Sequence, residues 1–268
     1  MASAAKDKML GLIGCRLFED EIAYVLSKDE QVARIWVVKN EESEDLMLKL
    51  ERAGVKRKVR LVEEEKLPDL PRPKALTVIV WLKPMALHSK PEKLNEEVHA
   101  TITKLEARCG SVLLFYGLCG NAFKHLERDA KSHDVPIVIL KDQGDQIVDD
   151  CIGTALGGTE EYYQLLKKSS GTFFLTPMWA ANWRELFHKV QILPDPNDVE
   201  GARYIFQCVG YKRVYKMDTG LGDQEKFDRE IDEFARLFEF EKGSVPCTLN
   251  VVERSYQIAK DALGQFTS

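Results

Sequence analysis

The chain has 268 residues, 44% of them hydrophobic, which is enough to bury a sizeable core, and its formal net charge is −5. That charge argues against nucleic acid as the main partner, because phosphate binding needs a concentrated basic surface. No apolar run approaches the length of a membrane span, and residues 1–8 are too short before Met9 to hold a signal peptide. We therefore expect a cytoplasmic protein without a membrane partner.

The one dense basic cluster is formed by Lys56, Arg57, Lys58 and Arg60, and three glutamates follow it at residues 63–65. Alternation of basic and acidic blocks over so short a distance is typical of a solvated surface segment. We therefore assign no binding role to this cluster.

Strand and helix patterns alternate along most of the chain. Runs rich in β-branched and aromatic residues predict strands at 9–14, 33–38, 58–62, 76–82, 112–116, 135–140 and 171–176. Apolar residues at helical spacing predict helices at 17–26, 43–53, 91–110, 121–132, 159–166 and 178–190. Ser43 and Thr159 are expected as N-caps, and Pro91 as the first residue of its helix. The strand at 58–62 is expected at an edge.

This alternation implies right-handed crossovers and a mainly parallel, doubly wound sheet with helices on both faces. We expect the sheet core to cover about residues 8–190. The alternation lapses near Pro194 and Pro196, and from about 195 to 268 the pattern is mostly helical, with helices at 199–210, 225–240 and 249–263. The sequence therefore predicts a single α/β domain over residues 1–268, with a helical C-terminal part packed onto the sheet.

Six cysteines in an intracellular chain of this size do not suggest a disulfide framework, which leaves metal binding or thiol chemistry for any that converge. Cys15, Cys119 and Cys151 each follow a strand signal, so a parallel sheet places all three at the carboxyl edge, where ligands bind. Cys119 also precedes an expected helix, and a thiol at a helix N-terminus is shifted toward thiolate. The alternative is a buried cysteine packed as a small hydrophobe.

Three thiolates and one further ligand make a tetrahedral zinc site, and an open fourth position lets the metal bind a substrate. We expect Cys15, Cys119 and Cys151 to bind zinc, with an iron–sulfur cluster as the alternative cofactor. Asp149, Asp150 or an exogenous group is expected to complete the shell, and Asp150 and Cys119 are the candidate catalytic groups. The alternative for the two aspartates is a solvated loop with a helix N-cap. Because the sequence has no closely spaced Cys-x-x-Cys pair, this site depends on the fold.

Trp179 follows the last predicted strand and is the candidate to form a wall of a ligand or cofactor pocket, with helix packing as the alternative. His88 also follows a strand and is a candidate for the same edge. Cys109, Cys208 and Cys247 are interpreted as structural. The sequence contains no dinucleotide fingerprint, no phosphate loop and no serine-hydrolase elbow.

Several segments resemble successive blocks of the family known as domain of unknown function 1638 (DUF1638). They are IGCRLFEDEI (13–22), YGLCGNAF (116–123), DDCIGTALGG (149–158), GTFFLTPMW (171–179) and EKGS (241–244). The three cysteines of the family pattern fall on Cys15, Cys119 and Cys151. Two positions depart from that pattern: Asp149 stands where the family usually has the histidine of His-Asp-Cys, and Met178 stands where it usually has glycine.

Members of the family are found largely in methanogenic archaea and strict anaerobes, many of which rely on corrinoid methyltransferase systems. The resemblance implies a metal-thiolate protein of anaerobic one-carbon metabolism that transfers a methyl group between a corrinoid protein and a thiol or other small acceptor. The alternative is a non-catalytic accessory protein that holds a metal or ligand for a corrinoid methyltransferase system. A cobalamin-binding Asp-x-His-x-x-Gly pattern is absent, so any corrinoid must arrive on another protein.

Overall fold

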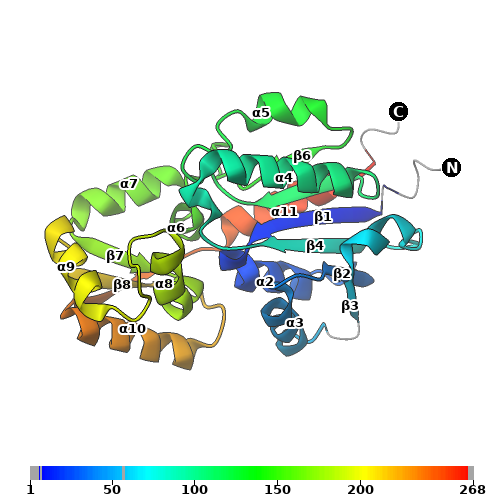
Figure 1. Ribbon diagram of the computed structural model, residues 1–268. Helices are drawn as coiled ribbons and strands as arrows, with labels where there is room; N and C mark the ends of the chain where they lie inside the picture. Colours follow the sequence, from blue (N-terminus) through cyan, green and yellow to red (C-terminus); the bar gives the residue numbers. More distant parts are fainter. Residues whose placement is uncertain (1–5, 7, 56–57, 265–268) are drawn as a thin grey trace.

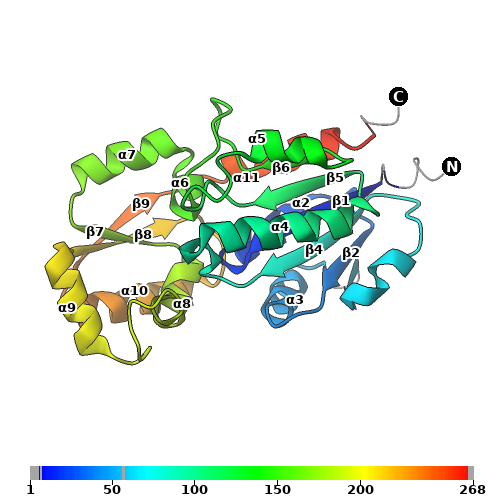
Figure 2. The same cartoon turned by 45° about the horizontal axis from the view of Figure 1, so that its top comes forward.

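The computed structural model describes residue 6 and residues 8–55 and 58–264 (Figure 1). Residues 1–5 and 7 of the N-terminal segment, and Lys56 and Arg57 of the basic cluster, lie outside the described residues. The chain forms two halves, each built on a parallel sheet, and the carboxyl ends of both sets of strands point toward the boundary between the halves (Figures 1 and 2).

The larger sheet has six parallel strands in the order β3-β2-β4-β1-β5-β6. They are β1 (Met9–Cys15), β2 (Arg34–Val38), β3 (Val59–Val62), β4 (Thr77–Lys83), β5 (Ser111–Phe115) and β6 (Ile137–Ile139). Every residue of β1 and β5 is buried, as continuous apolar runs in a sheet covered on both faces require. The predicted α/β fold with a parallel sheet is confirmed, β3 lies at the expected edge, and β5 lies inside the sheet.

Helices cover both faces of this sheet. On one face lie α2 (Glu19–Lys28), α3 (Ser43–Arg52) and the last helix, α11 (Asn250–Asp261), and on the other lies α4 (Pro91–Glu106) (Figure 2). Helix α4 begins with proline, and its apolar stripe, Leu94, Val98, Ile102 and Leu105, is buried against β1 and β5. The chain therefore returns at its end to complete the half with which it began.

The smaller sheet has three parallel strands in the order β7-β8-β9, namely β7 (Thr172–Leu175), β8 (Arg213–Asp218) and β9 (Glu241–Pro246). The helices of this half are α7 (Thr159–Lys168), α8 (Pro177–Lys189), α9 (Val199–Val209) and α10 (Gln224–Phe238). Side chains alternate across β7: Phe173 packs in a cluster with aromatic residues of α8, α9 and α10, and Phe174 packs with Tyr162 of α7. This sheet is thus also covered on both faces.

The C-terminal part is helical at α9, α10 and α11, as expected, but it also contains β8 and β9, which the sequence patterns did not predict. In β8 only Val214 and Met217 are buried, and no residue of the edge strand β9 is. Because so few of these residues are apolar and buried, the period-two signal of a strand is weak here. The six-stranded sheet therefore ends in sequence at β6, and β7 belongs to the second sheet.

The helix predicted from Asn121 to about Ser132 is shorter than expected. The backbone runs through turns as far as His125, and only α5 (Leu126–Asp129) and a 3-10 turn at Ala130–Ser132 follow. Cys119, Gly120 and Asn121 have positive φ angles of 47°, 68° and 70°. Three consecutive left-handed residues cannot begin a right-handed helix, so the chain turns first.

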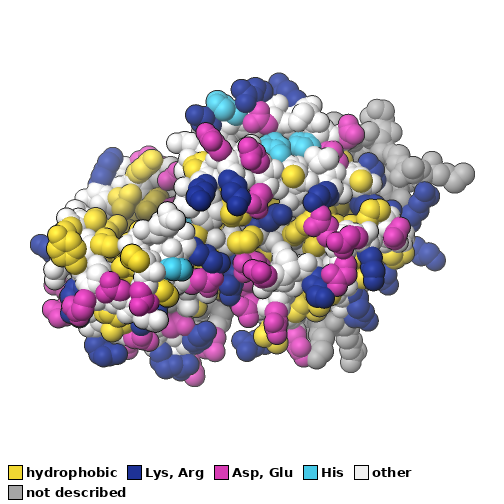
Figure 3. Space-filling view, viewed as in Figure 1, with side chains coloured by type: hydrophobic (Ala, Val, Ile, Leu, Met, Phe, Trp, Pro, Cys, Tyr) yellow, Lys and Arg dark blue, Asp and Glu magenta, His cyan; other side chains and the backbone are white. Residues whose placement is uncertain are grey.

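Among the described residues, no helix is long and apolar enough to cross a membrane. On the face shown in Figure 3, basic and acidic side chains are interspersed, and apolar side chains gather over α9, where Tyr204 and Val209 are 69% and 64% exposed. The charges of the chain are therefore spread over this face and do not form a field of one sign.

Candidate functional site

A small cavity of about 140 Å³ lies at the carboxyl edge of the larger sheet. Its walls come from the segments that follow β1, β4 and β5, from the start of a short helix, α6 (Cys151–Leu156), and from α8. The lining residues are Cys15, Leu17, Phe18, Pro84, Leu87, His88, Tyr116, Cys119, Gly120, Asp149, Asp150, Cys151 and Trp179. All three predicted cysteines, both candidate aspartates, His88 and Trp179 are thus brought to one place.

Cys15 is the last residue of β1 and is buried. From β1 the chain passes to α2 on one face of the sheet, whereas from the neighbouring strand β4 it passes to α4 on the other face. Loops that diverge in this way leave a crevice between adjacent strand ends, which is where open α/β sheets bind ligands. Cys15 therefore stands at the topological switch point of the sheet.

Cys119 is held beside the Asp149–Cys151 segment by backbone pairing. The backbone N–H of Leu118 donates to Val148 O at 2.8 Å, and that of Cys119 donates to Asp149 O at 2.9 Å. Gly117 permits this approach, because a Cβ at that position would overlap the carbonyl oxygen of Val148 and lie 2.8 Å from that of Asp149. The expectation that Cys119 stands at a helix N-terminus is wrong, since it lies in a turn.

Cys151 is the first residue of α6. Asp150 caps this helix, because its Oδ1 accepts hydrogen bonds from the backbone N–H groups of Ile152 and Gly153 at 2.8 and 2.9 Å. The indole Nε1–H of Trp179 donates to Cys151 Sγ at 3.3 Å. Asp150 thus has a structural role as an N-cap, and Trp179 contacts the site through a hydrogen bond.

Burial raises the pKa of all three thiols. The pKa of Cys15 rises to about 12, and those of Cys119 and Cys151 rise as well, chiefly because burial disfavours the thiolate. The pKa of Cys119 is raised further by Cys15 and Asp150, and that of Cys151 by Asp150, Cys15 and Cys119. The expected lowering of the Cys119 pKa is therefore corrected: without a cation, these groups are neutral thiols.

Tyr116 is the site residue that the sequence patterns missed. It follows β5 directly, it is 2% exposed, and its ring packs on Phe123 with centroids 5.4 Å apart. Its hydroxyl has no hydrogen-bond partner within the described part of the chain. The one sequence signal that could have identified it as a site residue is its place at the end of a strand, immediately before Gly117. The cavity thus contains a buried polar group that lacks a partner.

The donor set suits a thiolate-bound metal in its chemistry, since three sulfur atoms and a carboxylate are ligands that zinc accepts. In residues 6, 8–55 and 58–264, no three His, Cys, Asp or Glu side chains meet in an arrangement that could hold a metal ion. The three thiols therefore share one cavity without forming a preformed ligand set.

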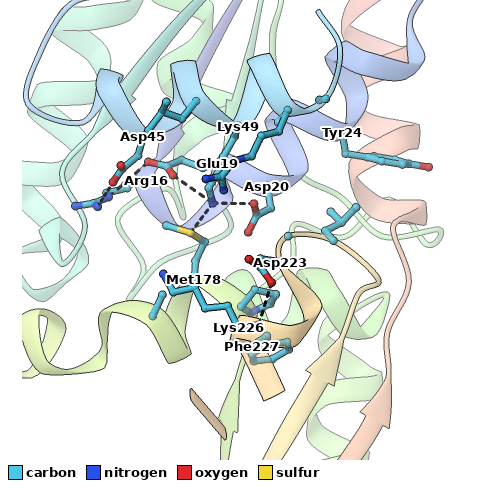
Figure 4. Close-up of a pocket in the computed structure, with 18 of the residues that line it drawn as sticks. Arg16, Glu19, Asp20, Tyr24, Asp45, Lys49, Met178, Asp223, Lys226 and Phe227 are labelled. Carbon is cyan, nitrogen blue, oxygen red and sulfur yellow. Dashed lines mark hydrogen bonds and ion pairs between the residues drawn. The ribbon is translucent and has the colours of Figure 1, made fainter. Parts of the chain in front are cut away.

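A larger, charged cleft of about 770 Å³ adjoins the cavity, between α2 and α3 of one half and α8 and α10 of the other (Figure 4). Lys49 Nζ lies 2.7 Å from Asp20, 3.4 Å from Glu19 and 2.8 Å from Met178 Sδ. A second cation, Arg16, pairs with carboxylates of both halves, namely Glu19, Glu42, Asp45 and Glu185. This network joins the halves beside Cys15.

The remaining cysteines lie elsewhere. Cys109 is buried beyond the end of α4, Cys208 is exposed on α9, and Cys247 is half-buried after β9. None of them lines the cavity. All three therefore lie outside the cavity.

Residues 82–256, more than half of the chain, match the model of a family described as "Protein of unknown function (DUF1638)". The matched part includes Cys119, Cys151 and Trp179, and Cys15 precedes it. Comparison with curated proteins and with solved structures returned no match. The chain belongs to the DUF1638 family.

Proposed function

We propose that Cys15, Cys119 and Cys151 form a metal-thiolate centre, with zinc as the metal, at which a small ligand binds. The observation that supports this is that three thiols from three distant segments line one cavity of about 140 Å³ at the switch point of a parallel sheet. Neutral buried thiols lose their protons when a divalent cation arrives, so binding releases protons and draws the sulfur atoms together. Asp149 or the ligand itself completes the coordination.

Within this proposal, the chemistry is methyl transfer between a corrinoid protein and a small thiol in the cytoplasm. Bound zinc supplies a positive charge that lowers the pKa of a substrate thiol. The substrate thiol releases its proton to solvent, a sulfur lone pair forms the new S–C bond, and the electrons of the broken Co–C bond remain on the cobalt of the carrier. The chain's own residues hold and orient the thiol and exclude water.

A cavity of about 140 Å³ has room for a small molecule but not for a corrin ring. The methyl carrier therefore docks outside the cavity in this proposal. The same small size favours the second candidate, an accessory protein that holds the metal or a small ligand for a methyltransferase. The two candidates share the metal site and differ in whether the methyl group moves on this chain.

The test begins with anaerobically purified protein, of which the metal content and the absorption spectrum are measured. Zinc gives a colourless protein, whereas an iron–sulfur cluster gives visible absorption. Protein loaded with one zinc is then mixed with a methylated corrinoid protein and a panel of thiols, and demethylation is followed by cobalt absorbance. We expect Cys119→Ser to slow demethylation at least 100-fold, while Cys208→Ser, at an exposed cysteine outside the cavity, leaves the rate unchanged.

Two results would favour the accessory protein over the enzyme. In the first, Cys119→Ser leaves the rate of demethylation unchanged; in the second, the protein binds metal but no demethylation occurs. A protein that takes up no metal under anaerobic, reducing conditions would end both.

A further inference from the structure

We propose that the thiol cavity selects a small uncharged ligand and rejects anions, and that the Tyr116 hydroxyl is the hydrogen-bond partner of that ligand. This rests on the proposed function in one respect only, namely that the ligand is a thiol. The selection itself follows from the cavity walls and applies to the metal-free protein as well.

The cavity wall has few groups that can neutralise an anion. Of the described residues that line the cavity, His88 is the only one that can take a positive charge, against two carboxyl and three thiol groups that can take a negative one. Arg16 follows Cys15 directly, but its guanidinium lies in the adjoining cleft among four carboxylates. A ligand with a carboxylate or sulfonate group would therefore be desolvated without a cationic partner.

The size and the remaining walls define the rest of the ligand. A protein cavity of about 150 Å³ holds one benzene molecule, so 140 Å³ has room for a molecule of about four to six non-hydrogen atoms. Leu17, Phe18 and Leu87, with the Trp179 ring, present apolar surface to it. The cavity thus suits a short thiol whose other end carries one neutral polar group.

Tyr116 supplies the contact for that polar group. Its hydroxyl is the one buried polar side-chain atom of the described cavity wall that has no partner. The other strong donor of the apolar wall, the indole N–H of Trp179, is already bonded to Cys151. A buried hydroxyl without a partner is unfavourable, so a ligand atom that bonds it is favoured over one that cannot.

Charge selection is tested on the metal-free wild-type protein with two alkylating reagents of matched size, neutral iodoacetamide and anionic iodoacetate. The rate of labelling at each cysteine is read by peptide mass spectrometry, with the exposed Cys208 as the internal reference. We expect the iodoacetamide-to-iodoacetate ratio at Cys15, Cys119 and Cys151 to exceed the ratio at Cys208 at least tenfold. Equal ratios overturn the selection against anions, whether or not the protein binds metal.

The role of Tyr116 is tested on cobalt-loaded protein, in which perturbation of the thiolate-to-metal absorption band reports thiol binding. 2-Mercaptoethanol and propane-1-thiol have the same number of non-hydrogen atoms, but only the first has a hydroxyl. We expect Tyr116→Phe to raise the Kd of 2-mercaptoethanol about tenfold and to leave that of propane-1-thiol within twofold. The matched control is Tyr163→Phe, because Tyr163 is a half-exposed residue of α7 outside the cavity.

An equal rise in the Kd of both thiols would mean that Tyr116 packs against the ligand and does not bond it. Unchanged Kd values for both thiols would likewise overturn the proposed hydrogen bond. Absence of the thiolate-to-metal band would contradict the proposed function instead, and the alkylation ratios would still decide the charge selection.

Discussion

Gly117 is the residue on which the approach of Cys119 to Cys151 depends. Because a Cβ there would overlap Val148 O, Gly117→Ala must separate the two backbone segments and weaken the hydrogen bonds that join them. We expect the affinity for Co²⁺ to fall at least tenfold while the far-ultraviolet circular dichroism stays that of the wild type. Metal titration followed by the thiolate absorption band measures this change.

The matched control is Gly153→Ala in the neighbouring helix α6, where a Cβ meets nothing closer than 3.8 Å. That variant should bind Co²⁺ as the wild type does. Unchanged affinity in both variants would mean that the site does not need the close approach at Gly117.

Trp179 is expected to stabilise the thiolate form of Cys151 through its indole N–H. Trp179→Phe keeps an aromatic ring in the wall but removes the donor, so the pKa of Cys151, already raised by burial, should rise further. At about 1 kcal/mol for one hydrogen bond, metal affinity should fall about fivefold, as measured by competition with a chelator. Trp36→Phe in β2, away from the cavity, is the control. A loss of thermal stability with unchanged metal affinity would reduce Trp179 to a packing residue.

At the scale of elements, the sequence predicted the larger sheet well because its central strands β1, β4 and β5 are buried on both faces and read as continuous apolar runs. It failed for β8 and β9, where burial is sparse. The helix start expected at Asn121 was also wrong, because the spacing of apolar residues does not report the left-handed backbone of residues 119–121.

Some features of the candidate site could likewise be predicted from the sequence, and others could not. The meeting of the three cysteines could be predicted, because a parallel sheet brings its strand ends to one edge. Three other features could not be predicted: the hydroxyl of Tyr116 without a partner, the close approach of Gly117 to Val148 O, and the hydrogen bond from Trp179 to Cys151. Each of them depends on segments that are distant in the sequence. Such contacts depend on how loops pack, which periodicity does not report.

The helices of the smaller half are held to its sheet by an aromatic cluster centred on Phe234 of α10. Phe234 is fully buried. Its ring centroid lies 4.7 to 5.7 Å from the ring centroids of Phe173, Trp183, Phe206 and Phe238. We expect Phe234→Ala to lower the free energy of unfolding by about 3–5 kcal/mol. Urea unfolding measures this loss, and Leu166→Ala at an exposed position should cost less than about 0.5 kcal/mol. Equal costs would mean that the cluster does not stabilise this half.

At the scale of the whole molecule, buried carboxyl groups of α2 at the boundary between the halves make stability depend on pH. Burial raises the pKa of Glu21 to about 8 and that of Glu19 to about 7, against an ordinary value of 4.5. Both are favoured in the folded protein when protonated. Their contribution to stability is therefore fully present below about pH 4.5 and is lost as the pH rises through 7 and 8.

We expect Glu21→Gln to remove much of this dependence, because the amide stays neutral at every pH. The free energy of unfolding of the wild type should fall between pH 5 and 8, by at most about 4 kcal/mol from Glu21 alone, and that of the variant should fall less. Denaturant titrations at several pH values measure the difference, with the exposed Glu225→Gln as the control. Parallel pH profiles for wild type and Glu21→Gln would contradict this account.

The return of α11 to the larger sheet has a consequence for the order in which the protein can fold during synthesis. The smaller half is continuous from α7 to β9, so its strands are all made before α11. The larger half begins first, yet β5 and β6 lack their cover on one face until residues 250–261 have left the ribosome. The larger half, whose first strand is made earliest, is thus completed after the smaller half, and the sheet that carries Cys15 at its edge is fully covered only once α11 has been made.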